Sequence, residues 1–286
     1  MPEIISSCVF CESENVLTNP AVLMPFLADR IFGWKPTSIN EDWKLRTIKN
    51  GHAYSICNTM YCENCKGVFL DMRFSNEELS KLYKDYRGKK YTELREFYEP
   101  GYKKINSIIN DGNQYIEKIE NFLKSYVSEP LSVLDYGGDS GKNTPFRKSS
   151  QNEVHVYDIS EVKVLDNVRQ VTKKEALNNY YDLVVCSNVL EHVSYPLLIV
   201  KELKAFLHKD SILYIELPFE DVMKKPYDLK SNCKYHWHEH VNFFSLDAIK
   251  EIVSRNQLTL VYSDIFDTNA GGKNVSLIRV IAKKAK

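Results

Sequence analysis

From Pro130 onward, short apolar strands alternate with amphipathic helices, and this alternation constrains the fold more than any other feature. Such a pattern predicts an α/β fold with a doubly wound, mostly parallel sheet. The predicted strands are 132–136, 154–157, 168–171, 182–186, 211–217, 258–262 and 275–282, with helices at 196–207 and 246–253. Ligands of these sheets bind beyond the carboxyl ends of the strands, where the strand order reverses. Functional residues are therefore expected at strand ends.

The first predicted strand, SVLDY, opens a strand-turn-helix unit with the glycine-rich turn GGDSG. Gly137, Gly138 and Gly141 permit tight turning and close approach of a ligand, and Asp135 can organise the turn or face that ligand. The spacing G-G-x-x-G is neither the dinucleotide motif nor a P-loop. Asp158 ends the next strand, where an acid can accept hydrogen bonds from ribose hydroxyls. The alternative for the turn alone is an ordinary strand–helix connection, but with Asp158 it indicates a nucleoside ligand without phosphates.

These segments resemble successive motifs of class I S-adenosylmethionine (SAM)-dependent methyltransferases: VLDYGGDSG, then YDIS, then YDLVVCSNVLEHV. The usual first motif is Asp-x-Gly-x-Gly-x-Gly. Asp135, Gly137 and Gly141 match it, whereas Asp139 occupies the position of the middle glycine. The resemblance covers about residues 130–282 and implies a Rossmann-like methyltransferase fold with SAM as cofactor.

The resemblance also implies roles for individual residues. The glycine turn would lie against the methionine part of SAM, and Asp158 would hold the ribose. Ser187 and Asn188, after the fourth strand, would border the reacting methyl group. Glu191 and His192 follow in a segment, LEHV, that is widespread in this fold and often packs beside the cofactor.

Four of the seven cysteines form two Cys-x2-Cys pairs, Cys8 with Cys11 and Cys62 with Cys65. Two such pairs can complete a tetrahedral site without an open position, which predicts structural zinc. Closing the loop between the pairs costs about 3–4 kcal/mol, whereas structural zinc contributes on the order of 10 kcal/mol. The alternative is four unlinked thiols. Uneven cysteine placement and an odd count favour a reducing cytoplasm over a disulfide framework.

The chain divides into three predicted parts. A capping box, Ser75-x-x-Glu78, begins a helix, and a second helical stretch is predicted over 102–127. The predicted parts are a zinc-binding module at 1–74, a helical connector or lid at 75–129 and a SAM-binding methyltransferase domain at 130–286.

The cysteine pairs, followed by YCENCKGVFLDMRFSNEELSKLYKDYR, are similar to the zinc-binding module that precedes certain bacterial methyltransferases. These include sugar C-methyltransferases that act on nucleotide-linked ketosugars. In that subfamily, polar residues of a His-Glu-His element lie at the active site. The segment HWHEHVNFFS places His238, Glu239 and His240 in this element, with Trp237 where relatives often have tyrosine.

Methylation of an alcohol, or of a carbon beside a ketone, requires a base that removes a proton. Histidine suits this role because its pKa lies near neutrality and a neighbouring carboxylate can orient the ring. His240, Glu239 and His238 are therefore the predicted catalytic residues. Two alternatives remain open: the clustered histidines bind a second metal ion, or alternate residues point to opposite faces and only one or two reach the site.

The balance of positive and negative charges indicates which class of molecule accepts the methyl group. Lys plus Arg and Asp plus Glu each number 38, so the net charge is +0, which disfavours nucleic acid as the partner. No run of about 18 apolar residues and no secretory signal is present, so we expect a cytoplasmic protein without a membrane span. We predict methylation of a small polar acceptor, a sugar or nucleotide sugar in surface-polysaccharide or natural-product biosynthesis. The alternatives are an RNA methyltransferase with an RNA-binding zinc module, and a non-catalytic binding protein that keeps the fold.

Overall fold

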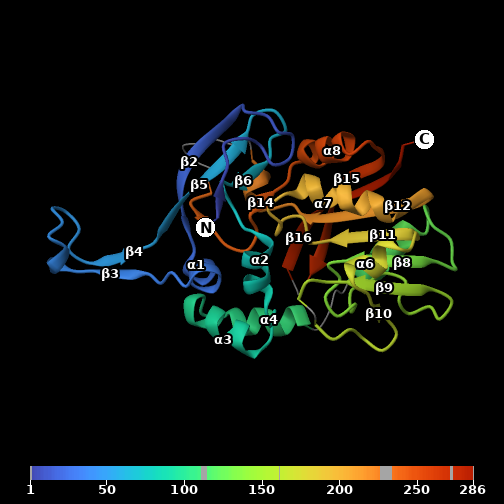
Figure 1. The fold of residues 1–286 in the computed structure, drawn as a ribbon, viewed down its shortest axis with the longest axis horizontal. Helices are drawn as coiled ribbons and strands as arrows, with labels where there is room; N and C mark the ends of the chain where they lie inside the picture. Colours follow the sequence, from blue (N-terminus) through green and yellow to red (C-terminus); the bar gives the residue numbers. More distant parts are fainter. Residues whose placement is uncertain (1, 111–114, 161, 226–233, 271–272, 286) are drawn as a thin grey trace.

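The computed structural model describes residues 2–110, 115–160, 162–225, 234–270 and 273–285 (Figure 1). Cys233 lies outside the described residues. Within these ranges, seven strands form the largest sheet. In spatial order they are β10 (Arg169–Gln170), β9 (Glu153–Tyr157), β8 (Ser132–Tyr136), β11 (Tyr181–Ser187), β12 (Leu207–Pro218), β16 (Lys273–Lys284) and β15 (Leu258–Ala270).

The topology of this sheet confirms the predicted α/β class. The strands from β10 to β12 run parallel, whereas β16 is antiparallel to both of its neighbours, β12 and β15. The strand order reverses between β8 and β11, which pair side by side. The carboxyl ends of these two strands therefore mark the expected ligand site.

Helices cover both faces of the large sheet. They are α5 (Ile116–Leu123) on one face, and α6 (Lys173–Leu177), α7 (Pro196–Leu203) with the 3-10 turn Lys204–Phe206, and α8 (Leu246–Arg255) on the other. Successive strand residues point to opposite faces. In β8, Val133 accordingly packs with Leu123 of α5, while Leu134 belongs to the core around Val200 of α7.

Two helix predictions are wrong. The segment 137–152, described throughout, consists of turns and bends and contains no helix after the glycine turn. Pro145 interrupts it, and Phe146 adopts a left-handed φ of 61°, which no helix accommodates. The stretch predicted as one helix over 102–127 forms α4 (Tyr102–Asn110) and α5, and residues 111–114 between them lie outside the described part.

The N-terminal part has its own sheet, completed by residues from far along the chain. Its five strands lie in the order β13 (His236–Trp237), β2 (Val16–Leu23), β5 (Ser55–Cys62), β6 (Val68–Leu70) and β14 (Asn242–Phe243). The His-Glu-His element therefore crosses from one edge of this sheet to the other. The three-part division of the chain stays a prediction, but the sheet of 1–74 takes two strands from residues 236–243.

Smaller elements surround this sheet (Figure 1). Strand β1 (Glu3–Ile4) pairs with β7 (Met72–Arg73), and β3 (Thr37–Ile39) pairs with β4 (Gly51–Ala53) in a projecting hairpin that contains the 3-10 turn Glu41–Trp43. The others are α1 (Pro25–Phe32) and the 3-10 turn Asp221–Met223. The connector contains α2 (Asn76–Tyr83), α3 (Lys89–Tyr98) and α4. The predicted capping box is confirmed, because Ser75 Oγ accepts the Glu78 N–H and the Glu78 carboxylate accepts the Ser75 N–H.

Candidate active site and four-cysteine cluster

Asp135 lies at the carboxyl end of β8, beneath the glycine turn. Its side chain is buried, and Thr144 Oγ1 donates a hydrogen bond of 2.5 Å to Oδ2. Burial raises the pKa of Asp135 to about 7. A Cβ on Gly138 would stand 2.6 Å from the Asp135 carboxyl carbon, so only glycine fits above this side chain.

The turn itself requires left-handed backbone. Gly137 and Gly141 have φ values of 80° and 77°, and a Cβ on Gly137 would stand 2.4 Å from Val189. Asp139, where the resemblance expects glycine, also has a positive φ of 53°. Aspartate is among the few other residues that tolerate this conformation, so the substitution preserves the path of the turn.

Asp158 at the end of β9 faces the same turn. Oδ2 accepts the Asp139 N–H at 2.9 Å, while Oδ1 accepts both the N–H and the hydroxyl of Ser160, at 2.7 and 2.5 Å. A carboxylate has about four lone-pair positions. Among the described residues three are used, which leaves one acceptor position on Oδ2 for a ligand hydroxyl.

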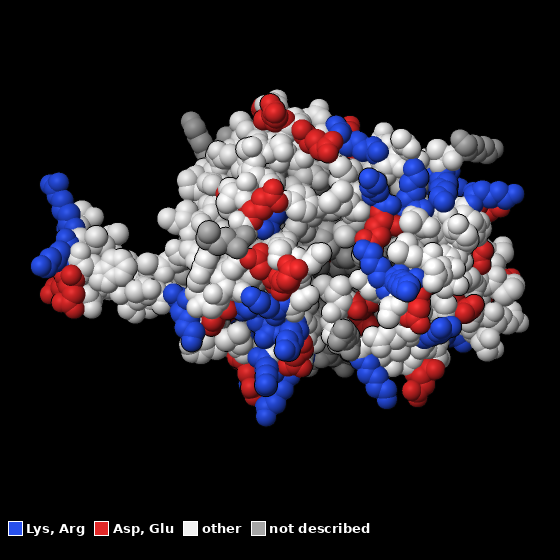
Figure 2. Space-filling view, in the orientation of Figure 1, with Lys and Arg blue, Asp and Glu red and all other residues white. Residues whose placement is uncertain are grey.

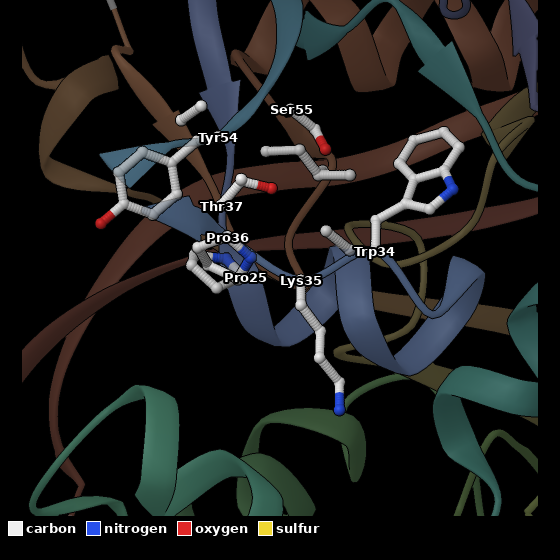
Figure 3. A pocket seen from close by; sticks show the side chains of 10 residues that line it. Pro25, Trp34, Lys35, Pro36, Thr37, Tyr54 and Ser55 are labelled. Carbon is white, nitrogen blue, oxygen red and sulfur yellow. The ribbon is translucent and has the colours of Figure 1, made fainter. Parts of the chain in front are cut away.

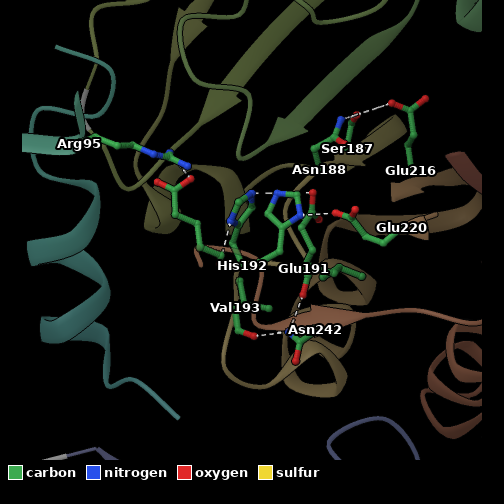
Figure 4. Close-up of polar contacts among 12 residues, drawn as sticks. Arg95, Ser187, Asn188, Glu191, His192, Val193, Glu216, Glu220 and Asn242 are labelled. Carbon is green, nitrogen blue, oxygen red and sulfur yellow. Dashed lines mark hydrogen bonds and ion pairs between the residues drawn. The ribbon is translucent and has the colours of Figure 1, made fainter. Parts of the chain in front are cut away.

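Ser187 and Asn188 end β11, across the switch point from Asp135. Ser187 Oγ donates to Glu216 Oε1 at 2.9 Å, and Asn188 Nδ2 donates to Ser187 Oγ at 3.0 Å (Figure 4). Glu216, at the end of β12, is fully buried and also accepts the hydroxyls of Tyr115 and Tyr214. This carboxylate fixes Ser187 and Asn188 at the edge of the sheet.

The loop after β11 is hydrogen-bonded to the His-Glu-His loop. The backbone N–H groups of Val241 and Asn242 both donate to the carbonyl of Glu191, at 2.8 and 3.1 Å. The Asn242 amide donates to the carbonyls of Val193 (Figure 4) and Leu190, and its oxygen accepts from the buried Arg73. Two segments about 50 residues apart in sequence are thereby held as one unit.

His240 is the member of the His-Glu-His element that faces the loop after β11. Its Nδ1 lies 2.7 Å from Glu220 Oε1, and its ring packs edge-on against His192 with centroids 4.6 Å apart. Burial opposes the charged form of this ring, but the Glu220 hydrogen bond and nearby carboxylates outweigh it, so the pKa of His240 is raised. Glu191 is 1% exposed, and burial raises its pKa to about 7.

The structure places Glu239 and His238 differently, because both are held by α3. Glu239 Oε2 lies 2.6 Å from Arg95 Nη1 (Figure 4). His238 Nδ1 lies 3.1 Å from Glu99 Oε1. Trp237 is fully buried, and its indole N–H donates to Thr59 inside the N-terminal module. One of the three predicted catalytic residues, His240, thus lies beside Glu191 and His192, whereas Glu239 and His238 both contact the end of α3.

Sequence reasoning missed two carboxylates that organise this site, Glu216 and Glu220. Both stand at or just after the end of β12, where the fold places functional residues. Their position at the end of a predicted strand is the sequence feature that could have identified them as site residues. The ion pair from Arg95 to Glu239 had no such signal, since it joins residues 144 positions apart.

The four cysteines predicted as metal ligands do come together. Their sulfurs lie within 4.8 Å of one another and all four side chains are buried. The Cys8–Cys65 and Cys11–Cys62 sulfurs are 3.6 and 3.5 Å apart. Nearby N–H groups point at the sulfurs: Phe10 N at Cys8, Asn64 Nδ2 at Cys11 and Cys65 N at Cys62.

A separate hollow of about 230 Å³ lies at the root of the β3–β4 projection (Figure 3). Trp34, Pro36 and Tyr54 line it, together with Lys35 and Ser55. It holds none of the predicted site residues. Among the described helices, none is long and apolar enough to cross a membrane.

The comparisons with known proteins agree with the fold. The methyltransferase domain family matches residues 109–263, more than half of the chain. An uncharacterized protein of Methanocaldococcus jannaschii is 26% identical over 181 residues, covering 57% of this chain and 78% of that protein.

One solved structure supports the fold, and a second is also similar. The 1,6-didemethyltoxoflavin-N1-methyltransferase of Burkholderia thailandensis, solved with S-adenosylhomocysteine, is 17% identical, with a TM-score of 0.53 over 79% of this chain and 99% of that one. A SAM-dependent methyltransferase of Methanosarcina mazei is 16% identical, with a TM-score of 0.44 over 57% and 96%. The chain therefore belongs to the methyltransferase domain family and has the sheet of class I SAM-dependent methyltransferases.

Proposed function

We propose that this chain transfers a methyl group from SAM to a small polar acceptor, a sugar or nucleotide sugar. One observation carries the proposal: a single short loop, 187–192, joins the cofactor end of the site to the predicted base. Asn188 stands at the switch point, and His192 four residues later packs against His240.

The residues at the switch point fit SAM. Asp158 has one acceptor position free for a ribose hydroxyl, and the tight backbone at Gly137 and Gly138 would lie along the methionine part. Ser187 and Asn188, fixed by Glu216, would border the methyl group. When bound, SAM supplies an electrophilic methyl group on a positively charged sulfur.

His240 is the proposed base. Because Nδ1 is engaged by Glu220, Nε2 is the nitrogen that can take the acceptor's proton. His240 would take the acceptor's proton at Nε2 as the methyl group passes from the sulfur, which would keep the electron pair, to the acceptor oxygen or carbon. Glu239 and His238, anchored to α3, would hold the loop that carries this ring.

Two features support the acceptor class. On the face in view, lysine and arginine side chains are interspersed with acidic ones, which suits a small molecule better than a polyanion (Figure 2). An open hollow of about 350 Å³ in the connector is lined by three cations, Arg87, Lys89 and Lys103, and one carboxylate, Glu93. The excess of cations suits the diphosphate of a nucleotide sugar.

We also propose that the four cysteines bind structural zinc. A tetrahedron with zinc–sulfur bonds of about 2.3 Å has edges of about 3.8 Å, close to the sulfur separations in the cluster. The surrounding N–H groups would stabilise thiolates, the form that zinc binds.

The test is calorimetry with S-adenosylhomocysteine, followed by a screen of nucleotide sugars, glycans and RNA with labelled SAM. We expect binding, and turnover on a nucleotide sugar. His240→Asn should keep cofactor binding and lose about 10²–10⁴-fold in turnover. The matched control is His208→Asn, at the opposite end of β12. If the folded protein binds no cofactor, the proposal is overturned. If RNA is the only acceptor that becomes labelled, the acceptor is RNA and not a sugar. If His240→Asn turns over at the full rate, His240 is not the base.

A further inference from the structure

We propose that Glu191, His192 and His240 form a binding site for one divalent transition-metal ion at the acceptor end of the active site. One ligand atom from each residue lies within 4.8 Å of the other two. Two imidazoles and one carboxylate are a donor set that Zn²⁺, Fe²⁺ and Mn²⁺ accept, with coordination positions left open. The inference rests on the proposed function for the place of the acceptor.

Both imidazoles are oriented as metal ligands are. His240 Nδ1 lies 2.7 Å from the Glu220 carboxylate, and His192 Nδ1 lies 3.3 Å from the backbone carbonyl of Glu239. Each Nδ1 faces an acceptor, so each carries the ring proton and leaves a lone pair on Nε2. Metal-binding histidines characteristically donate their other N–H to a carboxylate or carbonyl in this way.

Glu191 supplies the second, independent observation. Its side chain is 1% exposed, and neither carboxylate oxygen has a hydrogen-bond partner in the part of the chain that the structure describes. The His192 Nε2 atom lies 3.8 Å from Oε1, beyond hydrogen-bond distance. A buried carboxylate without partners is costly, and buried charges in proteins are paired or bind metals.

Among the described residues, Glu191, His192 and His240 all lack a positively charged or proton-donating partner at the point where they meet. When both rings are neutral with the proton on Nδ1 and Glu191 is ionised, Nε2 of each ring and the Glu191 carboxylate offer only lone pairs, so none of these atoms donates a proton. A cation among them satisfies all three. The positions are fixed by backbone, because Val241 N and Asn242 N bind the Glu191 carbonyl.

A bound cation would supply Lewis acidity and a point of attachment for an acceptor oxygen at an open coordination position. His240 would then act as a ligand, and the acceptor's proton would pass to water instead of Nε2. The inference therefore changes one part of the proposed function, the role of His240, and leaves cofactor binding untouched.

The test is Mn²⁺ binding, followed by electron paramagnetic resonance, by protein that carries one zinc ion per chain in the four-cysteine cluster, with S-adenosylhomocysteine calorimetry on the same samples. Manganese is chosen because the four-thiolate cluster does not favour it. We expect one Mn²⁺ per chain, lost in Glu191→Gln and in His192→Asn. Glu220→Gln, which removes the carboxylate behind His240, should weaken binding about 10–100-fold. His236→Asn, an exposed histidine of the same segment, is the matched control and should bind normally.

The outcomes are distinguishable. Cofactor binding without Mn²⁺ binding overturns the metal site and leaves His240 as the base. Mn²⁺ binding that survives in both Glu191→Gln and His192→Asn also overturns it, because the ion then sits elsewhere. Loss of cofactor binding in folded wild-type protein overturns the proposed function instead. Retained cofactor binding in the variants shows that they fold.

Discussion

Replacing Asp135 by Asn should make the cofactor-free protein more stable at alkaline pH, even though the residue lies in the cofactor site. The reason is the buried carboxyl at the end of β8, whose pKa burial raises to about 7. A folded-state pKa above the unfolded value means that the folded protein binds the proton more tightly. Stability is therefore highest below the unfolded pKa of about 4 and falls as pH rises through about 7.

The magnitude follows from the size of the shift. One pKa unit corresponds to about 1.36 kcal/mol. Between about pH 5.5 and pH 8.0, the folded carboxyl loses its proton at about 7 while the unfolded one is already ionised. The wild type should lose about 2 kcal/mol of unfolding free energy from this group alone. Asparagine does not titrate. The unfolding free energy of Asp135→Asn minus that of the wild type should therefore increase by that amount between the two pH values.

The assay is urea unfolding of zinc-loaded, cofactor-free protein at both pH values. All other titrating groups are common to both proteins, and any packing change that the substitution causes contributes equally at each pH. Thr144→Val should have the opposite effect, because it removes the hydrogen bond that favours the ionised Asp135 carboxyl. The unfolding free energy of this variant should fall more between the two pH values than that of the wild type. A gap between Asp135→Asn and wild type that does not change with pH would refute the reasoning.

Two further substitutions test the sites. Cys62→Ser should abolish zinc binding, measured by metal analysis and chelator release, and should lower the unfolding free energy by several kcal/mol. Cys57→Ser is the control, because Cys57 is buried but lies outside the cluster. Loss of zinc in Cys57→Ser would contradict the assignment. Gly138→Ala forces a Cβ to 2.6 Å from the Asp135 carboxyl carbon. It should weaken S-adenosylhomocysteine binding at least about tenfold by calorimetry, and unchanged affinity would mean that the turn does not contact the cofactor.

Much of the large sheet was predictable because its parallel strands β8, β9 and β11 are short, largely apolar runs. Ser132–Tyr136 was predicted to the residue, and the other strands differ mainly in length. A parallel strand buried on both faces reads as such a run whatever its neighbours are. The predicted helix after the glycine turn failed for a local reason, since Pro145 and the left-handed Phe146 stop it. Asp139 kept the path of the turn in the absence of glycine because aspartate tolerates a positive φ.

The acceptor end was less predictable because its contacts join distant segments. Nothing local in HWHEHV says that Trp237 pairs with Leu23, or that Val241 binds the carbonyl of Glu191. Which of the three polar residues reaches the site depends on those pairings. The sequence pattern drew attention to this element, and the tertiary structure brings His240 beside His192 while Glu239 pairs with Arg95; the catalytic roles stay predictions.

These pairings also bear on why a four-cysteine cluster precedes a methyltransferase sheet. Cys62 and Cys65 flank the turn before β6, and β6 pairs with β14, where Asn242 opposes Phe69. Asn242 stands two residues after His240. The Cys65 carbonyl also accepts the Ser245 hydroxyl at the start of α8. A metal that fixes this turn would therefore fix the loop carrying His240, because functional side chains are held accurately when their supporting contacts are rigid. On this reasoning the cluster supports the acceptor side of the active site and is more than an appended binding module, so its loss should impair turnover before it impairs cofactor binding.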